Sequence, residues 1–121
     1  MRLKIVDALK RARDRYVIRQ AERAVLPEFE ADAVIRRRVI FRGRVQKVGF
    51  RLEVLELARR LELTGFCRNL ENGDVLAELQ GEANRIDWLV AFMERLKRVR
   101  IREKTVEELA VDPAETEFSK Q

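Results

Sequence analysis

Nine residues, Gly43-Arg44-Val45-Gln46-Lys47-Val48-Gly49-Phe50-Arg51, connect an apolar segment that ends at Phe41 with an amphipathic helical pattern. A glycine-bearing turn between a strand and a helix directs main-chain amides toward its occupant, and the helix dipole favours an anion there. No Ser, Thr, Asp or Asn lies between Gly43 and Arg51, so the first helical amides need water or a bound oxyanion. Arg51 falls in the first helical turn, where the dipole disfavours a cation, and a bound phosphate would explain that placement. A water-capped turn with a solvated arginine is the alternative.

The composition excludes several classes of enzyme. The chain has 121 residues, of which 46% are apolar and 39% charged, and this predicts one domain with a very soluble surface. It has no histidine and its only serine is Ser119, which excludes His-based acid–base catalysis, catalytic triads and His-ligated metals. The single cysteine, Cys67, has no histidine to activate it, and we expect it to pack in the core. An enzyme of this composition would act through Arg, Lys, Asn, Gln and main-chain amides, with no metal and no cofactor.

The sequence also bears on cellular location. No apolar span approaches transmembrane length, and charges interrupt every candidate apolar core of a signal peptide. The single cysteine rules out an intramolecular disulfide and fits a reducing compartment. We therefore expect a cytoplasmic protein with no transmembrane segment.

The N-terminal residues differ from the rest of the chain in charge. Residues 1–24 carry eight Lys or Arg against three Asp or Glu, whereas residues 25–121 carry 18 of each sign. This predicts a basic amphipathic helical extension over residues 1–26, a linker over 27–35 and a domain over 36–121. The extension could pack on its own domain, form a homodimer with a second copy, or lie on an anionic surface. Its apolar face is expected to consist of Ile5, Leu9, Ala12 and Tyr16, widened by Val6, Ala8, Val17 and Ile18.

The remaining pattern consists of short alternating elements. Strands are expected at 34–42, 64–69 and 75–79 and within 99–109, with a last short one near Phe118. Helices with one apolar face are expected from Phe50 and, with Asn84 as a candidate cap, after the third strand. The Arg36-Arg37-Arg38 run is expected at an exposed strand edge. This order predicts an α+β sandwich with two helices on one face of an antiparallel sheet.

Element lengths place Asn69 near the glycine-bearing turn. The helix from Phe50 to Leu61 descends about 18 Å at ~1.5 Å per residue, and the strand from Leu63 to Asn69 returns about 20 Å at ~3.3 Å per residue. Asn69 is therefore expected level with the turn, where its side-chain amide would fix a water or a substrate oxygen. The alternative is that Asn69 caps the hairpin that Asn72-Gly73 indicates.

These motifs resemble those of the acylphosphatase family across residues 36–120. The family's Gly-x-Val-Gln-Gly-Val loop, which ends in an aromatic residue and an arginine, corresponds to residues 43–51. The other corresponding motifs are Leu63-Thr64-Gly65-Phe66-Cys67-Arg68-Asn69, Asn72-Gly73-Asp74-Val75, Leu79-Gln80-Gly81 and Glu115-Thr116-Glu117-Phe118. The resemblance implies a ferredoxin-like βαββαβ sandwich, which agrees with the order of elements above, and it does not extend to the N-terminal helix.

The resemblance implies hydrolysis of an acyl phosphate to a carboxylate and inorganic phosphate, without a metal or cofactor. By correspondence with the motifs, Arg51 would bind the phosphoryl oxygens and Asn69 would orient the attacking water. The main-chain amides of seven loop residues would bind the phosphate: Arg44, Val45, Gln46, Lys47, Val48, Gly49 and Phe50. Because an acyl phosphate has a good leaving group, positioning and electrostatic stabilisation suffice for catalysis.

Lys47 departs from the family pattern, which has glycine at this position. If the position requires a positive φ, a non-glycine residue costs about 1–2 kcal/mol there. The Lys47 ammonium would then either add a contact to the phosphate or block the loop. The alternative function is therefore a catalytically weakened, acylphosphatase-like module that binds an anion or a partner. Nucleic-acid binding is disfavoured, because the domain is neutral and has no evident cluster of aromatic residues.

Overall fold

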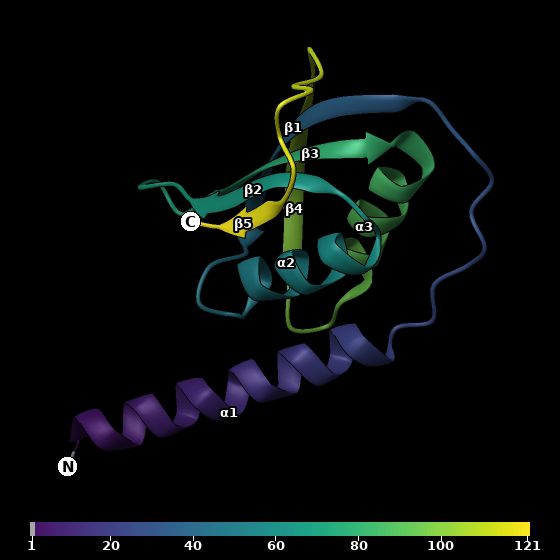
Figure 1. Ribbon diagram of the computed structural model, residues 1–121. Helices are drawn as coiled ribbons and strands as arrows, with labels where there is room; N and C mark the ends of the chain where they lie inside the picture. Colours follow the sequence, from purple (N-terminus) through teal and green to yellow (C-terminus); the bar gives the residue numbers. More distant parts are fainter. Residues whose placement is uncertain (1) are drawn as a thin grey trace.

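Two helices cover one face of a five-stranded sheet, and a third helix lies against this helical layer (Figure 1). The computed structural model describes residues 2–121. The elements are α1 (Arg2–Arg23), β1 (Val34–Arg44), α2 (Phe50–Arg60), β2 (Thr64–Asn69), β3 (Val75–Glu82), α3 (Ala83–Arg95), β4 (Arg100–Leu109) and β5 (Phe118–Lys120).

Four strands form the antiparallel part of the sheet, in the order β4-β1-β3-β2. Together with α2 and α3 they make the ferredoxin-like βαββαβ sandwich, so the predicted fold class is confirmed. One detail differs, because β5 pairs parallel to β2, from Gly65–Phe118 to Cys67–Lys120. The connection after β4 carries the chain from one edge of the sheet to the other. This crossing places β5 beside β2 and makes the sheet mixed.

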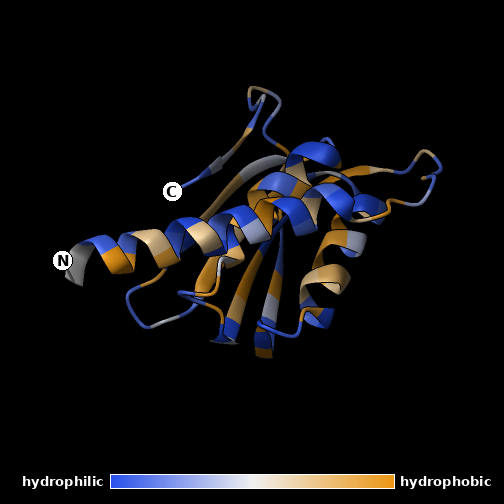
Figure 2. Cartoon of the chain, turned by 90° about the horizontal axis from the view of Figure 1, so that it is seen from below, coloured by the Kyte–Doolittle hydropathy of each residue, from blue (hydrophilic) through white to orange (hydrophobic). Residues whose placement is uncertain are grey.

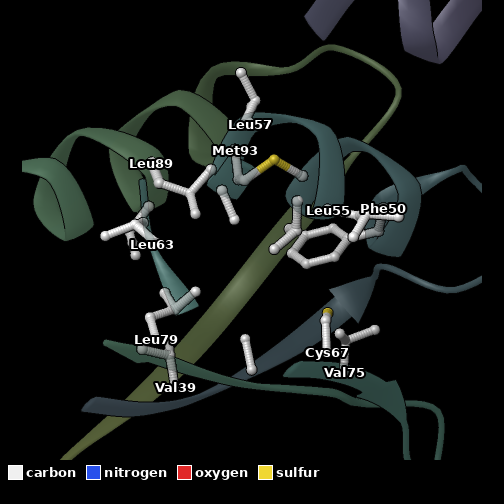
Figure 3. Close-up of a cluster of buried hydrophobic side chains, with 14 of the residues drawn as sticks. Val39, Phe50, Leu55, Leu57, Leu63, Cys67, Val75, Leu79, Leu89 and Met93 are labelled. Carbon is white, nitrogen blue, oxygen red and sulfur yellow. The ribbon is translucent and has the colours of Figure 1, made fainter. Parts of the chain in front are cut away.

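The core lies between the sheet and the helices α2 and α3. The predicted apolar faces of both helices are buried: Phe50, Val54, Leu57, Ala58 and Leu61 on the first, and Ile86, Leu89, Val90 and Met93 on the second. In Figure 3, Leu57 and Met93 of this layer lie above Val39 of the sheet. The rings of Phe41 and Phe50 pack with centroids 5.0 Å apart, which holds the beginning of α2 on β1.

The beginning of α3 is capped by a residue that the sequence pattern did not indicate. The helix begins at Ala83, so Asn84 lies inside its first turn and the prediction that it caps the helix was wrong. Asp32, in the segment before β1, accepts the Asn84 main-chain amide at 2.9 Å through Oδ2. The Asp32 amide in turn donates to Glu82 Oε2 at 2.7 Å. The cap comes from a residue 52 positions away, which local spacing does not reveal.

The arginine run in β1 does not lie at an exposed edge, so that prediction was also wrong. β1 lies between β4 and β3, and Arg36 is only 7% exposed. Because side chains alternate along a strand and Val39 faces the core, Arg36 and Arg38 point to the face away from the helices. There Arg36 contacts Glu78 at 3.0 Å and Glu115 at 2.8 Å, and Arg38 contacts Glu78 at 2.8 Å. Carboxylates from distant segments compensate these charges, which allows Arg36 to be buried while Arg38 stays partly exposed.

The helix α1 packs on its own domain, and only part of the predicted apolar face takes part: Val17 belongs to that face, whereas Ala21 does not. Val17 and Ala21 are fully buried, whereas Ile5, Leu9 and Tyr16 are 61%, 66% and 53% exposed. The domain meets only the C-terminal part of the helix, so most of the expected apolar face lies in solvent. The division of the chain at residues 26 and 35 stays a prediction.

Contacts from α2 hold the C-terminal end of α1. Nη1 of Arg60 donates to the carbonyl oxygens of Ala21 and Ala24 at 2.5 and 2.7 Å, where the helix dipole attracts a cation. The N-terminal part of α1 continues past the domain and displays polar and apolar residues together (Figure 2). Even α1, at 22 residues, is too polar to cross a membrane, and no other helix in the described part of the chain is long and apolar enough.

Candidate active site

The loop between β1 and α2, residues 45–49, forms a turn whose amides are available to a ligand. Lys47 and Gly49 both have left-handed backbone conformations, with φ angles of 62° and 78°. Gly49 occupies the N-cap position of α2 and provides no side-chain cap, as the sequence predicted. Among the described residues, the main-chain amides of 46–51 donate no hydrogen bond. These amides lie at the positive end of the α2 dipole and can therefore bind an anion.

Side chains fasten this loop to the rest of the domain at two points. Nε2 of Gln46 donates to the carbonyl oxygens of Leu70 and Asp74 at 2.8 and 2.9 Å, which ties the loop to the β2–β3 hairpin. Nε of Arg98 donates to the carbonyl oxygen of Val48 at 2.9 Å from the other side. The conformation of the loop thus depends on residues that are distant in sequence.

A pocket of about 320 Å³ opens beside the loop, and both residues expected to act in catalysis line it. Arg51 comes from the first turn of α2, and Asn69 comes from the end of β2. Nη1 of Arg51 donates to the main-chain oxygen of Gln121 at 2.5 Å. Its other guanidinium nitrogens make no hydrogen bond within residues 2–121 and are free to bind an oxyanion. The loop residues in the lining are Val45, Gln46, Lys47, Gly49 and Phe50.

Two of the expected phosphate-binding residues do not line this pocket. Arg44 is the last residue of β1 and pairs with Arg100 in the sheet. Val48 uses its carbonyl oxygen to accept the bond from Arg98. A role for the amides of Arg44 and Val48 in binding phosphate therefore stays a prediction.

The β2–β3 hairpin is closed by Asn72 and not by Asn69. Oδ1 of Asn72 accepts the main-chain amide of Asp74 at 3.0 Å, and its Nδ2 donates to Oδ2 of Asp74 at 3.1 Å. The Asn69 side chain is exposed and has no hydrogen-bond partner among the described residues. Its amide is therefore available to a water or ligand in the pocket.

Comparison with known proteins places the chain in one family. The sequence profile of the acylphosphatase family matches residues 37–120. The chain belongs to this family. It is 43% identical to an acylphosphatase from Clostridium beijerinckii over 65 residues, which cover 54% of this chain and 69% of that protein. It is 36% identical to an acylphosphatase from Oceanobacillus iheyensis over 83 residues, which cover 67% of this chain and 91% of that protein.

Structural similarity agrees with this assignment. The crystal structure of acylphosphatase from Bacillus subtilis superimposes with a TM-score of 0.67 at 27% sequence identity, covering 74% of this chain and 99% of that one. The chain is therefore an acylphosphatase-type hydrolase whose matched domain contains the loop, Arg51 and Asn69.

Part of the pocket wall lies outside the acylphosphatase match. Lys10, Arg13 and Asp14 of α1 line the pocket and precede the matched residues, whereas Lys120 of β5, which also lines it, is the last matched residue. These three residues of α1 were not predicted as site residues, because only the apolar residues of that helix were expected to make contacts. The usable signal was helical spacing, since these positions share a face with Val17.

Two buried titratable side chains lie beside the acylphosphatase pocket and do not line it. Cys67 is in the hydrophobic core, as predicted (Figure 3). Burial raises the pKa of its thiol to about 12, although the charges of Arg51 and Lys120 act in the opposite direction. A thiol with this pKa is not a nucleophile at neutral pH. Burial also raises the pKa of the Glu53 carboxyl, against the hydrogen bond and charge of Arg98, which lies 2.6 Å away.

Proposed function

We propose that this chain hydrolyses acyl phosphates to a carboxylate and inorganic phosphate, using Arg51, Asn69 and the loop amides. The observation that carries the proposal is that Arg51, Asn69 and loop residues line one pocket, where the amides of 46–51, the Asn69 side chain and every guanidinium nitrogen of Arg51 except Nη1 have no hydrogen-bond partner among the described residues. A tetrahedral phosphoryl group matches such a set of N–H donors and a guanidinium. Membership of the acylphosphatase family supports the same class of substrate.

The proposed reaction is an in-line displacement at phosphorus. Water attacks the phosphorus atom, the bond from phosphorus to the bridging acyl oxygen breaks, and the carboxylate leaves with the electron pair. One proton of the water passes to a phosphoryl oxygen, so the step needs no protein acid or base. Because the carboxylate is a good leaving group, the protein has only to align the reactants and stabilise the phosphoryl charge.

Each group has a distinct role in this proposal. The free nitrogens of Arg51 bind two phosphoryl oxygens, since a planar guanidinium matches that geometry better than an ammonium does. The loop amides bind the remaining phosphoryl charge at the N-terminus of α2. The side chain of Asn69 both donates and accepts hydrogen bonds, so it can hold the attacking water with a lone pair directed at phosphorus.

Initial rates with benzoyl phosphate test these roles. Arg51→Ala should lower kcat/KM by about 10²-fold or more, as expected for loss of a donor to a developing charge. Arg59→Ala is the matched control, because Arg59 is exposed on the same helix and does not line the pocket. Asn69→Ala should lower kcat more than it changes KM. If the unmodified chain hydrolyses benzoyl phosphate no faster than the Arg51→Ala variant does, the proposal is overturned.

The bond that breaks is tested separately with isotopically labelled water. Attack at phosphorus transfers the labelled oxygen to inorganic phosphate and leaves the carboxylate unlabelled. Label in the carboxylate would mean attack at the acyl carbon and would reject the proposed displacement.

One observation favours a second function, an anion-binding module with little turnover. Lys47 lines the pocket at the position where the family pattern has glycine, and the residue is exposed. An ammonium there strengthens the binding of phosphate whether or not the water is aligned. Two results together would favour this second function over the first. The unmodified chain would bind phosphate in calorimetry but hydrolyse benzoyl phosphate negligibly, and Lys47→Gly would restore the hydrolysis.

Two expectations about the whole molecule stay predictions: a cytoplasmic location, and a homodimer formed through α1. The dimer is supported by an exposed apolar strip on α1, in which Ile5, Val6, Leu9 and Tyr16 are 53–66% exposed. A second copy that covered this strip would remove it from water. Sedimentation of the full chain at increasing concentration should then reveal a dimer that Leu9→Glu abolishes. A monomer throughout would exclude it.

A further inference from the structure

We propose that α1 provides a second subsite in the pocket, where Lys10 and Arg13 bind a negatively charged group on the acyl part of the substrate. This inference rests on the proposed hydrolysis of acyl phosphates and narrows the substrate class. The preferred acyl phosphate would carry a further anionic group, a carboxylate or a phosphate, at a distance from the reacting phosphoryl group. Because the family match covers residues 37–120, the wall formed by α1 is an addition to the matched domain.

The position of α1 relative to the loop is defined by two close contacts. Val17 is fully buried and packs on Gly49 so closely that a Cβ atom on Gly49 would lie 2.6 Å from Val17 Cγ2. Arg98, which donates to Val48 in the loop, also holds its guanidinium 5.9 Å from the centre of the Tyr16 ring. These contacts place α1 and the loop in one packed unit, so residues of α1 near Val17 keep a defined position beside the pocket.

The packing of Val17 directs the preceding turns of α1 toward the pocket. Lys10, Arg13 and Asp14 precede Val17 by seven, four and three residues, and positions with this spacing share one face of a helix. All three line the pocket. The N-terminal part of α1 extends beyond the domain on the side of the β1–α2 loop (Figures 1 and 2).

The pocket contains more positive charge than a phosphoryl group needs. Its cationic lining residues are Lys10, Arg13, Lys47, Arg51 and Lys120, and its acidic one is Asp14. Asp14 Oδ1 accepts bonds from Nε and Nη2 of Arg13 at 3.2 and 3.0 Å, so it orients that guanidinium and compensates one charge. Lys10 forms no ion pair within the described residues. Arg51 and the loop suffice for the phosphoryl dianion, which leaves the cations of α1 for another anionic group.

The size of the pocket is consistent with a substrate larger than phosphate. Its volume of about 320 Å³ falls at the lower end of the range of about 300–1,000 Å³ that is typical of pockets for whole small molecules. Leu52, which is partly exposed, adds apolar surface to the lining, and this suits the carbon skeleton between two anionic ends. The proposed substrate thus places its phosphoryl group at the loop and its second charge at α1.

Two substrates of similar size test the inference, 4-carboxybenzoyl phosphate and 4-methylbenzoyl phosphate. The full chain should show the lower KM for the carboxylated substrate. The double variant Lys10→Gln/Arg13→Gln should raise that KM by about three- to tenfold, the range expected for partly exposed charge contacts. The KM for 4-methylbenzoyl phosphate and the inhibition constant of inorganic phosphate should change less than about twofold. The single variant Lys10→Glu should remove the preference or reverse it, because it places a like charge beside the carboxylate.

The matched control removes two charges from another face of α1. Arg15 and Arg19 are exposed and do not line the pocket, so Arg15→Gln/Arg19→Gln should alter neither KM. An equal loss with both substrates in Lys10→Gln/Arg13→Gln would overturn the inference, because it would assign these cations to the phosphoryl group. A ratio of the two KM values that is the same in this variant as in the full chain would also overturn it. In either case, turnover of 4-methylbenzoyl phosphate by the full chain above the Arg51→Ala level would still support the proposed function. If neither substrate is hydrolysed above that level, both proposals fail.

Discussion

Arg98 and Glu53 form an ion pair beneath the β1–α2 loop, with Nη2 and Oε1 2.6 Å apart. The Glu53 side chain is completely buried, and its Oε2 has no hydrogen-bond partner within residues 2–121. The same Arg98 donates through Nε to the carbonyl oxygen of Val48. One side chain thus compensates a buried charge and holds the β1–α2 loop, which couples the stability of α2 to the geometry of the pocket.

Replacement of Arg98 with alanine should destabilise the protein in a pH-dependent way. The change leaves a buried carboxylate without its cation, which costs about 3–5 kcal/mol. Burial raises the pKa of Glu53 and Arg98 opposes this, so the pKa should rise further in the variant. The folded state then keeps the proton to a higher pH than the unfolded state, and stability falls as pH rises from the unfolded pKa through the folded one. Urea unfolding should therefore show a larger loss at about pH 8 than at about pH 5.

The double variant Arg98→Ala/Glu53→Gln provides the control for this effect. Glutamine removes the buried charge, so part of the stability should return and the additional dependence on pH should disappear. Activity should stay low in both variants, because the Val48 carbonyl has lost its donor in each. A loss of stability that is equal at the two pH values would show that ionisation of Glu53 is not its source.

Lys47→Gly should stabilise the protein slightly and change its activity. Lys47 and Glu62 are the non-glycine residues with positive φ in the described part of the chain, at 62° and 57°. Glycine removes about 1–2 kcal/mol of backbone strain at such a position. It also increases the conformational entropy of the unfolded chain, which lowers the free energy of unfolding by about 0.5–1 kcal/mol. Both Lys47→Gly and Glu62→Gly should therefore gain about 0.5–1 kcal/mol in denaturant unfolding. Only Lys47→Gly should alter kcat/KM, since Glu62 does not line the pocket.

Lys47→Ala separates the ammonium from the backbone strain. Alanine keeps a Cβ at positive φ and removes the charge. If the lysine contributes a contact to phosphate, this variant should raise the KM for benzoyl phosphate without gaining stability. A lower KM in Lys47→Ala would instead show that the lysine obstructs the loop.

Gly49→Ala should be strongly destabilising for two separable reasons. Its φ of 78° disfavours a side chain by about 1–2 kcal/mol, and the new Cβ would meet Val17 Cγ2 at 2.6 Å, which adds about 1–3 kcal/mol of overpacking. The double variant Gly49→Ala/Val17→Ala should recover only the second part. A double-mutant cycle in thermal unfolding measures that coupling, with Ala21→Gly as a control at another buried position of α1. Additive effects would mean that Val17 and Gly49 do not meet in solution.

Gln46→Ala should weaken the loop and reduce catalysis together. Its side-chain amide donates two hydrogen bonds to the hairpin, to Leu70 and Asp74, each worth about 0.5–1.5 kcal/mol net. A loss of about 1–3 kcal/mol is therefore expected, with a fall in kcat/KM because the loop amides are less well ordered. Gln46→Glu should be worse, since it directs a carboxylate at two carbonyl oxygens. Full activity in Gln46→Glu would show that the loop is held by other contacts.

Some features of this site could be predicted because they depend on local order in the chain. The lengths of the helix and the strand between Phe50 and Asn69 predicted that the start of α2 and the end of β2 lie level with each other. Arg51 and Asn69 do line the same pocket. The uncapped start of α2 also followed from the residues present, since none of them has a capping side chain. In contrast, Asp32 at the start of α3 and Glu115 beside Arg36 come from distant segments, and no local pattern indicates them.

The amino-acid sequence by itself determined the βαββαβ order, the buried faces of α2 and α3, and the turn that exposes amides before Arg51, because each depends on periodicity or residue type over a few neighbouring positions. Only the tertiary structure decided which face of α1 is buried. Val17 meets Gly49, where the absence of a Cβ leaves room for it, and this contact carries Lys10 and Arg13 to the pocket while Ile5 and Leu9 stay exposed. The physical reason is that burial depends on the shape and charge of the surface a helix meets, and the helix's own pattern does not specify that surface.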